Sequence, residues 1–139
     1  MAKHFDIIVV GCGPTGAIAS LLLAQKGLQV AIVEQHQNVY PHPRAIALNG
    51  FSMGLIKELL QDLWGEFEFT TAVEVGYVLS KDKMDEPFGK MQPPIIEGKI
   101  LDLDHYGFLN WFNQPQLERL LRKKIENTKT FKRTLITLP

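Results

Sequence analysis

The chain has 139 residues, of which 45% are hydrophobic and 22% are charged, so it has enough apolar content for one packed domain and is not a disordered chain. Fifteen Lys and Arg residues balance fifteen Asp and Glu residues, which argues against a nucleic-acid partner, and the single Cys excludes an internal disulfide and a multi-cysteine zinc site. No apolar run approaches the ~18 residues of a membrane span, and the N-terminus has no signal-peptide pattern, so we expect a cytoplasmic protein with no membrane span.

The first elements along the chain predict a βαβ unit. Residues 5–10 (FDIIVV) are apolar and rich in β-branched side chains, which is typical of a parallel strand covered on both faces. Residues 15–26 carry apolar side chains at helical spacing, and Gly27 suits the position after a helix. A second apolar run at residues 29–33 (QVAIV) ends at Glu34. Together they span about thirty residues, the usual length of such a unit.

The middle of the chain predicts a loop, a helix and a strand region. Residues 39–44 contain two prolines and should form a loop, because proline removes a backbone donor and restricts its predecessor. A helix is predicted at about residues 51–60, with Asn49 or Ser52 near its N-terminal cap. Apolar side chains alternate within residues 67–80, which favours strand.

The last third of the chain predicts one further helix. Residues 81–94 are polar and contain Pro and Gly, so they indicate a long excursion or a hairpin tip, and residues 100–103 are a candidate strand. The helix is expected to open with Pro115 in its first position and Gln114 near the cap. Residues 134–138 are predicted to form a final strand.

Three glycines between the first strand and helix form a G-x-G-x-x-G pattern at Gly11, Gly13 and Gly16, and Glu34 follows roughly 20 positions later. The first glycine permits a tight turn, the second lets a pyrophosphate approach the backbone, and the third lets the helix pack closely. The amides at the start of the helix would hold the phosphates. Glu34 would accept hydrogen bonds from both ribose hydroxyls and repel a 2′-phosphate, so the pattern predicts FAD or NAD rather than NADP here.

Plainer interpretations accompany this one. In the first, the glycines are turn residues of a parallel α/β protein that binds no nucleotide. Cys12 would need a base partner to act as a nucleophile, and none is evident, so we interpret it as a small space-filling residue. The four histidines lack the spacing of metal ligands, and we predict neither a catalytic nor a metal-binding residue.

Three further stretches add to the glycine loop: Val33-Glu34, Pro43-Arg44-Ala45 and Gln114-Pro115-Gln116-Leu117. With them, the chain resembles FAD-dependent aromatic hydroxylases of the p-hydroxybenzoate hydroxylase type, closest to the hydroxyphenylpropionate hydroxylase branch, best over residues 5–60 and 108–121. The resemblance implies bound FAD, NADH or NADPH as a transient reductant, O2 as oxidant and a small phenolic substrate. The alternatives are another FAD oxidoreductase (a halogenase, epoxidase or reductase) or a non-catalytic, truncated dinucleotide-binding module.

The resemblance also implies roles for particular residues. The glycines would contact the FAD pyrophosphate, and Glu34 would bind the adenosine ribose. Arg44 would lie along the diphosphate and ribose, with a solvated loop arginine as the plainer alternative. Gln114 would contact the ribityl chain, with a plain helix cap as the alternative. The predicted cofactor-binding residues are Gly11, Gly13, Pro14, Thr15, Gly16, Glu34, Gln35, Arg44 and Gln114.

The predicted fold class is α/β: a Rossmann-like FAD/NAD(P)-binding domain with a parallel sheet, plus a partial antiparallel β excursion. Members of the family are much longer than this chain, so we expect residues 1–139 to be the N-terminal part of an FAD-binding domain, with residues 67–110 as the excursion toward a mostly missing substrate domain. The chain by itself should be inactive. Its open strand edges predict a homo-oligomer or association with the missing part of the chain.

Overall fold

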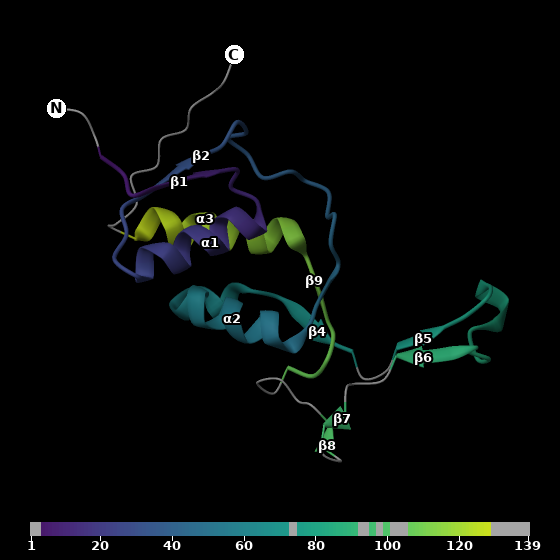
Figure 1. Ribbon diagram of the computed structural model, residues 1–139. Coiled ribbons are helices and arrows are strands. Elements are labelled where there is room, and N and C mark those ends of the chain that lie inside the picture. The colour runs from purple at the N-terminus through teal and green to yellow at the C-terminus, as the bar shows by residue number, and fades with distance from the viewer. Residues whose placement is uncertain (1–3, 73–74, 92–94, 97–98, 101–105, 129–139) are drawn as a thin grey trace. The chain divides into compact units, whose positions relative to one another are not determined.

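Figure 1 shows the computed structural model, which describes residues 4–72, 75–91, 95–96, 99–100 and 106–128. The chain divides into two units. The first comprises Met1–Ile46, Ile56–Glu68 and Asn113–Pro139, and the second comprises Ala47–Leu55 and Phe69–Phe112. Within the described ranges, no helix is long and apolar enough to cross a membrane.

The first unit contains the predicted βαβ arrangement. β1 (Ile7–Val10) and β2 (Val30–Val33) pair in parallel, with Ile7 opposite Val30 and Val10 opposite Val33. α1 (Pro14–Gln25) joins them in sequence and packs against both strands (Figure 1). The predicted α/β class with a parallel strand pair is therefore confirmed.

The core of the first unit lies between its helices and β2. α3 (Gln114–Asn127) packs against α1, and α2 (Gly50–Leu60) ends in this unit and continues into a 3₁₀ helix, η1 (Gln61–Glu66). On α3 the buried apolar residues recur every three or four positions, so that they share one face. The larger buried apolar side chains of the unit are Leu21, Val30, Ile32, Ile56, Leu59, Leu60, Leu63, Phe67, Leu117, Leu120, Leu121 and Ile125.

The two strands differ in how far they are covered. All but the last residue of β2 is buried, as predicted, but burial alternates along β1, where Ile8 and Val10 are 62% and 80% exposed. The prediction that both faces of β1 are covered is therefore wrong. Alternate side chains of a strand point to opposite faces, and α1 packs against only one of them.

α3 begins one position earlier than predicted. Asn113 is the N-cap, and its side chain accepts a hydrogen bond from the backbone N–H of Gln116 at 3.2 Å. Gln114 and Pro115 therefore form the first turn, where the missing N–H of proline costs nothing. The cap predicted for α2 is correct at Asn49, whose side chain accepts from the N–H of Ser52 at 2.8 Å.

The second unit is built from short antiparallel strands. β9 (Asn110–Phe112) lies between β3 (Ala47–Leu48) and β4 (Phe69–Thr71). Asn110 is fully buried and ties the three strands together, because its amide donates to the carbonyl of Leu48 at 3.4 Å and accepts from the hydroxyl of Thr71 at 2.8 Å. Its buried polar atoms are thus satisfied across the whole sheet.

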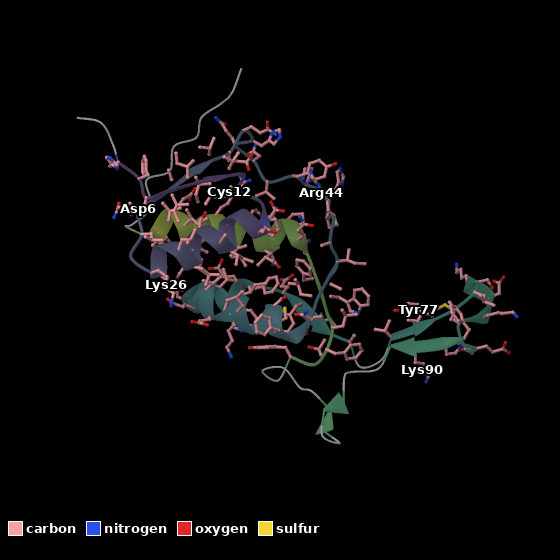
Figure 2. All side chains as sticks on the ribbon, viewed as in Figure 1. Asp6, Cys12, Lys26, Arg44, Tyr77 and Lys90 are labelled. Atoms are coloured by element: carbon pink, nitrogen blue, oxygen red, sulfur yellow. The ribbon has the colours of Figure 1, made fainter. Side chains whose placement is uncertain are left out.

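Two hairpins complete the second unit. β5 (Val75–Tyr77) pairs with β6 (Gly89–Met91) around a 3₁₀ turn, η2 (Lys81–Lys83), and Figure 2 marks this hairpin by Tyr77 and Lys90. β7 (Ile95–Ile96) pairs with β8 (Lys99–Ile100). The prediction that this part of the chain forms antiparallel β structure is therefore confirmed. Of the candidate strand at residues 100–103, Ile100 lies in β8, and residues 101–103 lie outside the described residues, as does the strand predicted at residues 134–138.

Candidate functional site

The glycine loop forms the turn between β1 and α1, and its three glycines lie in different surroundings. Gly11 has a φ of +96°, a conformation that side-chain-bearing residues rarely adopt, and its N–H donates to the carbonyl of Val33 at 2.7 Å. At Gly16 a Cβ would overlap the carbonyl oxygen of Gly11, so only glycine lets α1 approach the loop this closely. At Gly13 a Cβ would meet nothing within 4 Å.

The N-terminus of α1 adjoins this open space and has no side-chain cap. Gly13 is the N-cap residue, with extended backbone, and Pro14 follows it in the first turn. The first amides of a helix have no partner within the helix, and the helix dipole places partial positive charge there. An anion that occupied the space over Gly13 would therefore meet unsatisfied donors.

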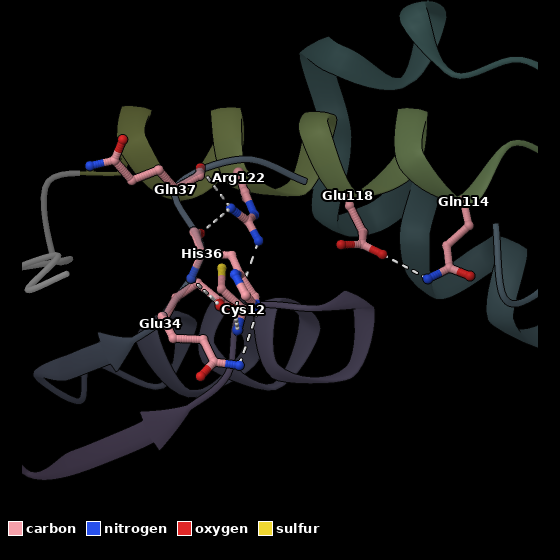
Figure 3. A network of polar contacts seen from close by, with 8 residues as sticks. Cys12, Glu34, His36, Gln37, Gln114, Glu118 and Arg122 are labelled. Carbon is pink, nitrogen blue, oxygen red and sulfur yellow. Dashed lines mark hydrogen bonds and ion pairs between the residues drawn. The ribbon is translucent and has the colours of Figure 1, made fainter. Parts of the chain in front are cut away.

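Glu34, at the end of β2, is held by the backbone. One carboxylate oxygen accepts from the N–H of Cys12 at 2.7 Å, and the other accepts from the N–H of His36 at 2.8 Å (Figure 3). Burial raises the pKa of Glu34, but these two donors and the charges of Arg122 and His36 outweigh it, so the pKa lies below its ordinary value of 4.5. Glu34 is therefore a fixed carboxylate that carries its charge at neutral pH.

Arg122 of α3 forms an ion pair with the same carboxylate. Its Nη2 lies 3.8 Å from Oε2 of Glu34, and its Nη1 donates to the carbonyls of His36 and Gln37 at 3.3 and 3.1 Å. The side chains of Glu34 and Arg122 are each only 12% exposed. The ion pair is thus largely shielded from solvent, which strengthens it relative to a surface pair.

Gln114 holds a second loop in place. Its side-chain oxygen accepts from the backbone N–H groups of Arg44 and Ala45, at 2.8 and 2.7 Å, and its amide nitrogen donates to Glu118 at 2.7 Å. Both acceptor positions of the amide oxygen are therefore used. The guanidinium of Arg44 lies over the ring of Tyr40, 4.9 Å from its centroid, and Figure 2 labels Arg44 on the segment that follows β2.

These groups surround a cavity of about 750 Å³, within the size range of small-molecule sites. Of the predicted cofactor-binding residues, the structure brings seven to its wall: Gly11, Gly13, Pro14, Glu34, Gln35, Arg44 and Gln114. Thr15 and Gly16 are not part of the wall. Thr15, which follows Pro14 on α1, is exposed, and Gly16 packs against the backbone of Gly11. No set of three metal-binding side chains occurs within the described ranges.

Among the wall residues that were not predicted, Glu118 and Arg122 are the two that come from α3. Both follow Gln114 at intervals of four, so that Gln114, Glu118 and Arg122 share one polar edge of the helix (Figure 3). That spacing was visible in the sequence and could have placed the three residues on one face. Nothing local in the sequence indicated that this face meets the loops after β2.

Comparison with known proteins places these features in a family. A protein-family model described as "FAD binding domain" matches residues 4–134. The p-nitrophenol 4-monooxygenase of Pseudomonas putida aligns with a TM-score of 0.71 at 18% identity, over 97% of this chain and 32% of that one. A ternary complex of aklavinone-11 hydroxylase with FAD and aklavinone aligns with a TM-score of 0.66 at 20% identity, over 97% of this chain and 26% of that one.

Curated relatives match shorter stretches. The 2,4-dichlorophenol 6-monooxygenase of Cupriavidus pinatubonensis is 37% identical over 54 residues, which are 39% of this chain and 9% of that protein. A 4,4′-diapophytoene desaturase of Methylomonas is 42% identical over 52 residues, 37% of this chain and 10% of that protein. The chain thus spans about a tenth of such relatives and about a quarter to a third of the two solved structures.

The family match covers the glycine loop, Glu34 and α3, which together form the cavity wall, and it extends over most of the sequence. The fold agrees with it, because the two aligned structures, one of them a complex with FAD, share this arrangement of strands and helices at 18% and 20% identity. The chain belongs to the FAD binding domain family.

Proposed function

We propose that the chain is the FAD-binding portion of a flavin-dependent monooxygenase that hydroxylates a small aromatic substrate with NADH or NADPH and O2. The family match supports FAD. The similarity to p-nitrophenol 4-monooxygenase, aklavinone-11 hydroxylase and 2,4-dichlorophenol 6-monooxygenase supports aromatic hydroxylation. Bound FAD would supply the redox chemistry, by taking a hydride from the nicotinamide and passing the electrons to O2.

The observation that carries this proposal is the fixed carboxylate of Glu34 beside the open space at Gly13. Each oxygen of Glu34 accepts one backbone hydrogen bond and keeps a second lone pair. These lone pairs suit the two hydroxyls of a ribose, and the uncapped start of α1 suits the diphosphate next to it. Arg44 would add a cationic partner for the phosphates. The residues present therefore fit the adenosine diphosphate part of FAD.

The proposed ribose contact is tested by Glu34→Gln in the full-length protein. A glutamine replaces one acceptor oxygen by an NH2 group and removes the charge, so we expect affinity for FAD to fall at least about tenfold. Glu58→Gln, an exposed position on α2, is the matched control and should bind as the wild type does. Equilibrium titration of the apoprotein, followed by flavin fluorescence, gives both dissociation constants. Equal affinity of wild type and Glu34→Gln would contradict the proposed contact.

The proposed reaction is tested separately, by product analysis with a panel of phenols. We expect NADH or NADPH to be oxidised faster when a substrate phenol is present, with one atom of ¹⁸O2 appearing in the product. The 139 residues by themselves should be inactive, since they correspond to about a third of the solved chains. Reductant oxidation with H2O2 as the product and no oxygen insertion into any phenol of the panel would argue against hydroxylation of this substrate class.

A second candidate is a different FAD oxidoreductase. The matched stretches of a desaturase and of a soluble pyridine nucleotide transhydrogenase are 42% and 50% identical, at least as high as the 37% of the monooxygenase. Short matches of this kind support nucleotide binding without choosing the chemistry, because function resides in the rest of the site. Transfer of hydride to a soluble acceptor, in place of oxygen insertion, would favour this candidate.

A further inference from the structure

The guanidinium of Arg122 is held by two hydrogen bonds and one ion pair, all to the segment after β2. Nη1 donates to the carbonyls of His36 and Gln37, and Nη2 lies beside the carboxylate of Glu34 (Figure 3). A further donor, Nε, is buried and meets no acceptor among the residues that the structure describes. A buried donor without a partner is unfavourable, so Nε does not hold the side chain in place. The contacts of the two terminal nitrogens therefore set the position of Arg122.

We propose that Arg122 is a positioning residue that orients the Glu34 carboxylate toward the ribose of the nucleotide, and thereby sets the preference of this site for a ligand with a ribose diol. This inference rests on the proposed function. Arg122 holds Glu34 in two ways. It forms an ion pair with the carboxylate, and it donates hydrogen bonds to the backbone carbonyls of His36 and Gln37, which follow Glu34. The backbone N–H of His36, which donates a hydrogen bond to the Glu34 carboxylate, belongs to this same stretch of backbone.

An arginine suits this task better than a lysine. Its planar guanidinium presents several donors in a rigid fork, so that one side chain binds two carbonyls and faces a carboxylate at the same time. A lysine would supply the positive charge but only a single point of attachment. The lysine variant therefore separates the charge of Arg122 from its geometry.

A merely structural role makes a different prediction. If Arg122 only stabilised the packing of α3, its loss would lower affinity for every nucleotide that binds the cavity, in parallel with a loss of stability. If it acts through Glu34, its loss matters only when the ligand has ribose hydroxyls for Glu34 to bind. The ratio of two affinities therefore distinguishes the two roles.

The experiment compares adenosine diphosphate with 2′,3′-dideoxyadenosine diphosphate, by calorimetric titration of the full-length apoprotein. Wild type should prefer the ribose form by about tenfold or more. In Arg122→Gln this preference should fall to less than about twofold while affinity for the dideoxy form changes little, and Arg122→Lys should retain only part of the preference. Arg119→Gln, an exposed arginine on the same helix, is the matched control and should behave as wild type.

Two results would overturn the inference. One is an unchanged preference in Arg122→Gln; the other is an equal loss of affinity for both ligands, which would leave Arg122 with a structural role. Thermal unfolding without ligand identifies a variant that binds weakly because it is unfolded, and Arg122→Lys then supplies the comparison. Failure of the proposed function looks different, because wild type would then bind neither nucleotide or would not distinguish between them.

Discussion

Gly13 and Gly16 belong to one turn, but the space around their Cα atoms differs. A Cβ at Gly16 would overlap the carbonyl oxygen of Gly11 and lie 3.1 Å from its carbonyl carbon. Gly13 has φ −74° and ψ −175°, which any residue adopts, and a Cβ there would meet nothing within 4 Å. Gly16 thus serves the packing of α1, whereas Gly13 preserves open space next to the helix N-terminus.

Alanine at these two positions should therefore have separable effects. Gly16→Ala forces the backbone of Gly11 to move, so we expect it to lower the free energy of unfolding by more than about 2 kcal/mol. Gly13→Ala should change stability by less than about 0.5 kcal/mol but weaken FAD binding at least about tenfold, because its methyl group occupies the proposed phosphate space. Urea denaturation and FAD titration of both variants measure the two effects. Normal FAD binding by Gly13→Ala would argue against the phosphate position.

At the scale of the element, α3 joins two loops through one edge. Gln114 binds the amides of Arg44 and Ala45, and Arg122, two turns further along, binds the segment after β2. Glu118 lies between them and accepts from Gln114. The adjoining face of the helix contributes its apolar residues to the core, so packing fixes the edge that meets the loops.

Gln114→Leu tests whether this edge holds the Arg44 loop. The variant fills a similar volume but leaves two backbone donors and Glu118 without their partner, so we expect a loss of about 1–3 kcal/mol in the free energy of unfolding. Affinity for FAD should fall as well, because Arg44 is no longer held at the cavity wall. Gln25→Leu, at the exposed end of α1, is the control for adding an apolar side chain. A stability equal to that of the control would show that the loop does not depend on Gln114.

For the whole molecule, the lowered pKa of Glu34 links folding to pH. A carboxyl whose pKa is lower in the folded than in the unfolded protein stabilises the fold above the unfolded value, and this contribution is lost as the pH falls through the folded value. Glu34 has an ordinary value of 4.5 and a lower one here, so its contribution is complete at neutral pH and declines only below about pH 4.5.

Subtracting the stability of Glu34→Gln from that of wild type should isolate this contribution. We expect the difference in free energy of unfolding to be constant from about pH 6 to pH 8 and to shrink as the pH falls below about 4.5, because only wild type then takes up a proton at this position. Denaturant titrations across this range, without FAD, measure the difference. A difference that grows on acidification would mean that the folded protein raises the pKa of Glu34.

Part of this molecule was predictable because it is encoded locally. The βαβ unit, the turn glycines, the cap at Asn49 and the antiparallel character of the excursion follow from patterns a few residues long. β3 and β9 were not predicted, because two or three residues are too few to show a strand period. The exposure of Ile8 and Val10 was also missed, since an apolar run does not show what packs on each face. Self-association through such exposed surfaces stays a prediction.

The sequence by itself determined that the carboxylate at the end of β2 would lie beside the glycine turn at the end of β1. The two strands, the turn and the carboxylate all lie within about thirty residues, and the parallel pairing of the strands brings their ends together. Only the tertiary structure decided that α3 completes the site. Arg122 lies 86 positions from His36, and Gln114 lies 70 from Arg44. Helical spacing places Gln114 and Arg122 on one face of α3. Whether that face contacts the loops after β2 depends on how the apolar core packs.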